Sequence, residues 1–175
     1  YPEITLELTS NDQIADLLEH RTDIAIRVGE LSDSTLHARP LRSGAMAILA
    51  SPDYLRRHGV PKKPADLAQH QTLGFLQYES GNSWPLRHEG GEWLTTTPAI
   101  YASSGETLRA LALAGQGIAC LSEFMTQKDI AAGTLVPLLA KHYTGYQRPI
   151  HAVYYRNTQL SRRISCFLEF LQKKM

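Results

Sequence analysis

Small hydroxyl, amide and glycine residues lie at two strand-to-helix junctions of this sequence, and both junctions suit the binding of an anion. Ser10 and Asn11 follow one strand-like segment, and Ser103, Ser104 and Gly105 follow another. Because the first N–H groups of a helix have no partners within it, each helix start can bind a carboxylate. The alternative for each junction is a plain N-cap, worth about 1 kcal/mol of helix stability. If the chain folds the junctions toward each other, they enclose a cleft for a small anionic ligand.

Three further residues are candidates for the same cleft. Arg27 is a charge within an otherwise apolar strand segment. Its guanidinium could clamp a carboxylate through two hydrogen bonds, or it could face outward and pair with a surface carboxylate. Gly29 begins the loop after that segment, which could line the mouth of the cleft. Phe75 could face the ligand, although an aromatic residue at such a position more often packs in the core.

Other kinds of chemistry find little support in the sequence. The 7 histidines are scattered and the 2 cysteines lack metal-ligand spacing, so we expect no metal ion and no cofactor. No G-x-S-x-G elbow, Walker A loop or dinucleotide-binding glycine motif is present, so we expect that the protein is not an enzyme. The net charge of +1 argues against nucleic-acid binding by this segment. We also expect no membrane span and no signal peptide, and two reduced core thiols suit a cytoplasmic protein.

Hydrophobic periodicity predicts that strands and helices alternate in the first part of the chain. Alternation predicts a first strand, and a β-branched run predicts a later strand that is covered on both faces. Ser51, Pro52 and Gly59 have the types and spacing of a complete short helix. The predicted elements are strand 4–8, helix 11–20, strand 24–28, strands 36–41 and 45–50, helix 52–58 and a helical turn at 65–68.

The second part begins at Leu73 and follows the same alternation. Gly90-Gly91 suits a hairpin turn, and Ser103 and Glu106 have the spacing of a capping box. The predicted elements are strand 73–76, hairpin strands 84–88 and 92–97, strand 100–102, helix 106–114, strand 118–121, helix 124–132, edge strand 135–139, strand 149–155 and a final helix capped by Ser161.

The final helix carries an apolar stripe that must cover a sheet, and we expect it to pack on the first lobe. The chain then crosses twice between two lobes, which makes a hinge. The sequence therefore predicts an α/β protein of two Rossmann-like subdomains, formed by residues 1–72 with 152–175 and by residues 73–151.

Four motifs in register resemble the C-terminal effector-binding domain of LysR-type transcriptional regulators. They are Asp23-Ile24-Ala25-Ile26-Arg27-Val28-Gly29, Ala50-Ser51-Pro52-Asp53-Tyr54-Leu55, Ala114-Gly115-Gln116-Gly117-Ile118-Ala119 and Ala132-Gly133-Thr134-Leu135-Val136. The resemblance implies a fold like that of type 2 periplasmic binding proteins, with a small-molecule effector between the subdomains. It also implies that the chain lacks the DNA-binding domain and the first strand and helix of the effector domain.

The resemblance further implies the partners of the protein. Effector domains of this family pair side by side, which places residues 13–20 and 108–114 at a homodimer interface and predicts a tetramer for the full-length protein. DNA would be bound only through a separate N-terminal winged helix-turn-helix. The alternative is a solute-binding protein of a transporter, which has the same two-lobe architecture and needs an export signal in its gene.

Overall fold

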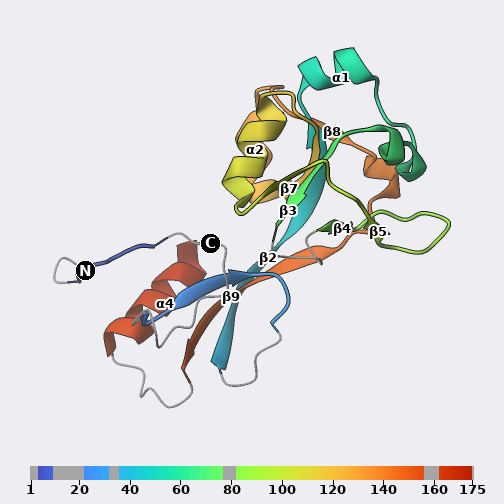
Figure 1. The fold of residues 1–175 in the computed structure, drawn as a ribbon. Coiled ribbons are helices and arrows are strands. Elements are labelled where there is room, and N and C mark those ends of the chain that lie inside the picture. Colours follow the sequence, from blue (N-terminus) through green and yellow to red (C-terminus); the bar gives the residue numbers. More distant parts are fainter. Residues whose placement is uncertain (1–3, 10–21, 32–35, 77–81, 156–161, 175) are drawn as a thin grey trace. The chain divides into compact units, whose positions relative to one another are not determined.

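The computed structural model describes residues 4–9, 22–31, 36–76, 82–155 and 162–174 (Figure 1). The chain divides into two compact units: unit 1 contains residues 1–44 and 148–175, and unit 2 contains residues 45–147. The chain passes from unit 1 to unit 2 between Gly44 and Ala45, and returns between Gln147 and Arg148. The sequence predicts two crossings and a C-terminal helix on the first lobe, and this division likewise has two crossings and places residues 148–175 in unit 1. No helix among the described residues is long and apolar enough to cross a membrane.

The described residues of unit 1 form three neighbouring strands and one helix. Strand β1 (Ala25–Val28) pairs antiparallel with β9 (Gln147–Tyr155), and β9 lies beside the first part of β2 (Leu36–Ala50). Helix α4 (Arg162–Lys174) buries Leu168 completely, as its apolar stripe predicted. Arg39 of β2 donates a hydrogen bond of 2.7 Å to Gln172, which ties this helix to the sheet.

Two sequence expectations for unit 1 are wrong. Residues 4–9 form no strand, and Leu8 is 87% exposed, because a strand needs a neighbour for its backbone and no described residue pairs with this segment. Strand β1 is not covered on both faces, since Ile26 is 46% exposed. β1 is antiparallel to its one described neighbour, and antiparallel strands can expose one face. The β-branched run of β1 therefore did not indicate burial on both faces.

Strand β2 is one continuous strand of 15 residues, where two short strands were predicted. Its second part pairs antiparallel with β7 (Ile118–Ser122) on one edge and with β8 (Val136–Leu138) on the other. Its first part instead lies beside β9. The strand is uninterrupted because different strands form backbone hydrogen bonds with its successive parts. A local sequence pattern cannot indicate such distant partners.

Unit 2 contains a mixed sheet with the strand order β8-β2-β7-β3-β6. Strand β3 (Thr72–Phe75) is parallel to both of its neighbours, β7 and β6 (Ile100–Ala102). Alternate residues of β2 and β7 enter two separate apolar clusters, one containing Ile48 and Cys120 and the other containing Leu49 and Leu121. The sheet is therefore covered on both faces, and β7 is buried at every residue as predicted.

Short helices and a hairpin complete unit 2. The helices lie close to their predicted positions, whereas the hairpin strands have two residues each, where strands 84–88 and 92–97 were predicted. Ser51 accepts a hydrogen bond from the Tyr54 N–H and caps α1. Proline 137 lies on β8, which pairs only with β2 among the described strands, as an edge strand predicts. The elements are α1 (Pro52–His58), η1 (Pro64–Gln69), β4 (Ser83–Trp84), β5 (Leu94–Thr95), α2 (Gly105–Leu113), α3 (Glu123–Ala131) and η3 (Ala140–His142).

The boundaries of the units differ from the predicted lobes. Residues 45–72 were expected in the first lobe and belong to unit 2, because their strand pairs with β7 and β8 there. The return crossing lies at residues 147–148 instead of 151–152. Composition shifts and prolines mark loops within unit 2 here, whereas the crossings themselves lie in regular strands.

Candidate functional site

The carboxyl ends of three neighbouring parallel strands meet at one edge of the sheet of unit 2. Strand β3 lies between β7 and β6 and runs parallel to both, so Phe75, Ser103 and Ser122 leave the sheet at the same end. From β6 the chain enters α2, and from β7 it enters α3. Open α/β sheets bind ligands beyond the carboxyl ends of their strands, because helix N-termini and loops gather there.

Ser104, and not Ser103, caps helix α2. The Ser104 hydroxyl accepts a hydrogen bond of 3.2 Å from the Thr107 N–H and lies 2.9 Å from the Thr107 hydroxyl. The predicted capping box of Ser103 and Glu106 is therefore wrong by one residue, and Glu106 instead forms an ion pair with Arg109. Ser103 is exposed, and its hydroxyl has no hydrogen-bond partner among the described residues. This hydroxyl is thus available at the start of α2.

Gly105 begins α2 beneath two apolar side chains. A Cβ atom added at Gly105 would lie 2.9 Å from Met125 Cε and 3.8 Å from Phe75 Cζ. The structure therefore brings Phe75 and Gly105 together, as predicted for one site, and adds Met125 beside them. Sequence analysis missed Met125. The available signal was its place in the first turn of α3, directly after the buried strand β7.

Asn82 fixes the backbone of Phe75 and was also missed. Its side-chain amide donates a hydrogen bond of 2.9 Å to the Phe75 carbonyl and accepts one of 2.8 Å from the Phe75 N–H. This close approach requires Gly74, because a Cβ atom there would lie 2.3 Å from Asn82 Oδ1. A glycine inside a predicted strand was the signal for such an approach.

The remaining predicted residues lie in unit 1 or outside the described residues. Arg27 is half-buried on β1, opposite His151 on β9. Gly29 follows at a φ of +110° and donates a hydrogen bond of 2.8 Å to the Pro149 carbonyl. Ser10 and Asn11 lie outside the described residues.

Beside Gly29 lies an arginine that the sequence did not single out. The Arg148 Nε atom is 3.6 Å from the position that a Cβ atom at Gly29 would take. A Cβ atom at position 29 would make only an ordinary van der Waals contact with this guanidinium, so it is the positive φ of Gly29 that favours glycine.

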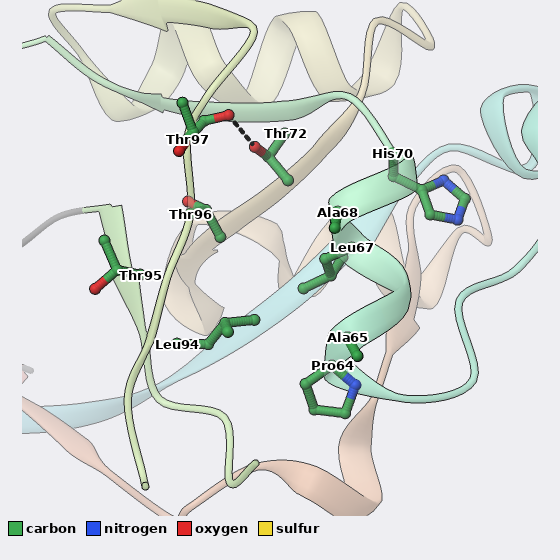
Figure 2. Close-up of a pocket in the computed structure, with 10 residues that line it drawn as sticks. All are labelled: Pro64, Ala65, Leu67, Ala68, His70, Thr72, Leu94, Thr95, Thr96 and Thr97. Atoms are coloured by element: carbon green, nitrogen blue, oxygen red, sulfur yellow. Dashed lines mark hydrogen bonds between the residues drawn. The ribbon is translucent and has the colours of Figure 1, made fainter. Parts of the chain in front are cut away.

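A separate hollow of about 330 Å³ lies at the opposite end of β3 (Figure 2). Figure 2 shows η1 along one side and the segment from Leu94 to Thr97 along the other, with the Thr72 hydroxyl donating to the Thr97 carbonyl at 3.3 Å. Thr72 is three residues from Phe75, or about 10 Å along an extended strand. No Lys, Arg, Asp or Glu lines this hollow, so it suits a carboxylate less well than the start of α2.

Comparisons with known proteins agree along the whole chain. The profile of the LysR substrate binding domain family matches residues 1–175. The HTH-type transcriptional regulator CrgA of Neisseria meningitidis serogroup C (strain 8013) is 44% identical over 175 residues, which cover 100% of this chain and 58% of CrgA. This chain thus spans little more than half the length of that curated relative.

Solved structures give the same result. The regulatory domain of CrgA, a LysR-type regulator from Neisseria meningitidis, has a TM-score of 0.92 at 44% identity, covering 99% of this chain and 85% of that chain. The regulatory domain of AphB from Vibrio vulnificus has a TM-score of 0.74 at 29% identity, covering 100% and 86% respectively.

Proposed function

Since this chain belongs to the LysR substrate-binding domain family, we propose that it senses a small, carboxylate-bearing effector and passes that signal to a DNA-binding domain. The observation that carries the proposal is the meeting of β7, β3 and β6 at the start of α2. Helix starts favour anions because N–H groups and the positive end of the helix dipole point outward.

The predicted fold class is confirmed by the structural relatives. They are LysR regulatory domains, which have the α/β fold of type 2 periplasmic binding proteins. The named relatives are transcriptional regulators and not solute-binding proteins of transporters, so the alternative function loses its support. Regulators of this kind generally catalyse no reaction, and we assign no catalytic residue. We place the sensing step in the cytoplasm, where a regulator reaches its DNA.

The proposed site has a polar and an apolar part within unit 2. The Ser103 and Ser104 hydroxyls and the start of α2 at Gly105 receive the effector carboxylate. The Phe75 ring and the Met125 thioether contact its apolar part, since both lie beside Gly105. Ser10, Asn11, Arg27 and Gly29 remain proposed effector contacts, as the sequence predicts.

We also propose that the protein pairs through the exposed face of α2. Leu108 and Ala112 are buried in the core of unit 2, so they cannot form the interface that was predicted for residues 108–114. The exposed face of the helix offers Thr107, Ala110 and Ala114. The predicted partner segment, residues 13–20, lies outside the described residues. A dimer of this kind, a tetramer of the full-length protein and DNA binding through an N-terminal winged helix-turn-helix complete the proposal.

Thermal unfolding with a panel of small aromatic and aliphatic carboxylates tests the proposal. A ligand that binds only the folded state at 100 times its Kd stabilises by about 2.7 kcal/mol, so a true effector raises Tm measurably. We expect Ser103→Ala to leave the ligand-free Tm unchanged and to reduce the shift. Thr95→Ala, at the hollow of Figure 2, is the matched control and should keep the full shift. A panel in which no carboxylate raises Tm would contradict the proposed function.

A further inference from the structure

We propose that Tyr143 is the positioning residue that fixes where the two crossing strands can bend, because its hydroxyl ties both of them to unit 2. The hydroxyl accepts a hydrogen bond of 3.0 Å from the Met46 N–H on β2. It also donates a hydrogen bond to the Tyr146 carbonyl, just before β9. A single side-chain oxygen thus joins the backbones of the segments that lead to both crossings.

Both bonds lie next to the boundary between the units. Met46 is the second residue of unit 2 after the crossing at Gly44–Ala45, and Tyr146 precedes the last residue of unit 2, Gln147. Motion of one unit against the other must bend the chain at these two crossings. A bond that anchors both segments on the side of unit 2 therefore keeps the bending out of unit 2.

The Tyr143 hydroxyl accepts a backbone N–H of β2 close to the part of the strand that pairs with β8. Strand β8 pairs with Ile48, Leu49 and Ala50 and ends there. Met46 lies two residues before Ile48, so its N–H points to the same edge of β2 as that of Ile48. The tyrosine oxygen thus binds β2 two residues before the first residue that pairs with β8.

Tyr143 is itself held firmly in unit 2. Its backbone forms an isolated bridge with Leu86, and its ring packs against the cluster that contains Met46 and Cys120. Burial raises the pKa of the Tyr143 hydroxyl, which therefore stays protonated and able to donate at neutral pH. The Tyr146 ring packs edge-on against Trp93, with 4.9 Å between the ring centroids. This contact holds Tyr146, whose carbonyl accepts the Tyr143 hydrogen bond.

The first crossing contains a glycine next to the anchored segment. Gly44 is the last residue of unit 1 before the crossing, and an added Cβ would meet no atom within 4 Å. A glycine within a strand has more backbone freedom than any other residue. An anchored Met46 beside an open Gly44 concentrates bending at residues 44–45. Bending at residues 44–45 does not depend on where an effector binds.

The first test is amide exchange in the Tyr143→Phe variant, which removes only the hydroxyl. We expect the Met46 amide to exchange at least tenfold faster, while the amide of Ile48, which pairs with both β7 and β8, keeps its rate. Tyr101→Phe removes another tyrosine hydroxyl of unit 2 and is the matched control. An unchanged rate at Met46 in a folded Tyr143→Phe protein overturns the proposal.

The second test measures the spread of distances between the units. Spin labels at Ala131→Cys on α3 and Glu169→Cys on α4, in a Cys166→Ser background diluted with unlabelled protein, report one unit against the other. We expect the distribution to widen at least 1.5-fold with Tyr143→Phe and to stay unchanged with Tyr101→Phe. Equal widths for the two variants overturn the proposal.

A third variant keeps the proposal testable if Tyr143→Phe fails to fold. Gly44→Val restricts the backbone at the first crossing and leaves the Tyr143 hydroxyl unchanged. The open space at Gly44 accepts the valine side chain. We expect the labelled distribution to become narrower than in the parent protein. A width equal to that of the parent overturns the assignment of bending to residues 44–45.

Discussion

Arg109 on α2 and Asp129 on α3 form a two-point ion pair. Arg109 Nε donates to Asp129 Oδ2 at 2.6 Å, and Nη2 donates to Oδ1 at 2.8 Å. Asp129 is buried, whereas Arg109 is partly exposed and also pairs with Glu106. The hydrogen bonds from Arg109 to Asp129 raise the pKa of the guanidinium. Because α2 follows β6 and α3 follows β7, the two strands that flank β3, this pair links the two helices of the candidate site.

Arg109→Lys should weaken this link although it keeps the charge. A lysine ammonium cannot make the two parallel hydrogen bonds, and the buried Asp129 carboxylate loses one donor. We expect Tm to fall by roughly 2–5 °C in a scanning calorimeter. Arg87→Lys is the control, since Arg87 forms only an exposed pair with Glu92 at 3.9 Å. Equal effects of both substitutions would show that the fork geometry of Arg109 contributes nothing.

Removal of the α1 cap should destabilise unit 2. Ser51 is 3% exposed, and its hydroxyl accepts the Tyr54 N–H at 3.2 Å. Ser51→Ala leaves that N–H without a partner, and we expect a loss of about 1 kcal/mol in the free energy of unfolding. Ser51→Thr keeps the acceptor and should recover most of it. Urea unfolding of the three proteins makes the comparison, and equal stability of the alanine variant would contradict the capping role.

Acid should destabilise the protein in part through His70. Burial lowers the pKa of His70, and the nearby His58 acts in the same direction. The unfolded chain therefore binds this proton more readily than the fold does. The stability that His70 contributes is complete above its unfolded pKa of about 6.5 and is lost as the pH falls below that value.

The hydrogen bonds around His70 give the same direction. The Tyr54 hydroxyl accepts the Gln71 N–H at 2.9 Å and lies 3.2 Å from His70 Nδ1, which accepts the hydroxyl proton when the neutral imidazole carries its hydrogen on Nε2. Protonation of Nδ1 removes that acceptor. His70→Gln should therefore show a smaller drop in the urea midpoint between pH 7 and pH 5 than the parent protein. A drop of the same size in both would exclude His70 as a source of the acid sensitivity.

Two glycine substitutions should differ sharply in cost. At Gly105 an added Cβ meets the flexible end of Met125 at 2.9 Å, whereas at Gly117 it meets the backbone oxygen of Gln71 at 2.6 Å. We expect Gly105→Ala to change stability by less than about 0.5 kcal/mol and Gly117→Ala to cost about 1–3 kcal/mol. Met125→Ala should also couple to Gly105→Ala in a double-mutant cycle of unfolding energies. Additive effects would mean that the two residues do not touch.

A charge on the exposed face of α2 should separate the proposed dimer. Ala110 is exposed in the single chain, so Ala110→Arg should leave the fold intact and place a bulky cation in the interface. We expect the dimer dissociation constant to rise at least tenfold in analytical ultracentrifugation, about 1.4 kcal/mol. Ala131→Arg, on the exposed end of α3, is the control and should leave the constant unchanged. Dimerisation that survives Ala110→Arg would exclude this face of α2.

Local sequence patterns determined most elements of unit 2. Ser51, Pro52 and Gly59 marked α1 completely, and the buried run from Ile118 to Leu121 marked β7. These elements are predictable because capping, proline geometry and burial on two faces each depend on residues close together in the chain. The four family motifs depend on the same local order, so the family was also evident from the sequence.

Tertiary structure alone decided the features that depend on distant partners. The continuity of β2, the isolation of residues 4–9 and the position of the crossings follow from which strands supply backbone hydrogen bonds. Met125 and Asn82 join the candidate site, and Tyr143 reaches Met46, only because separate strand ends are brought together. Such contacts join residues far apart in sequence, and no period of 2 or 3.6 residues encodes them.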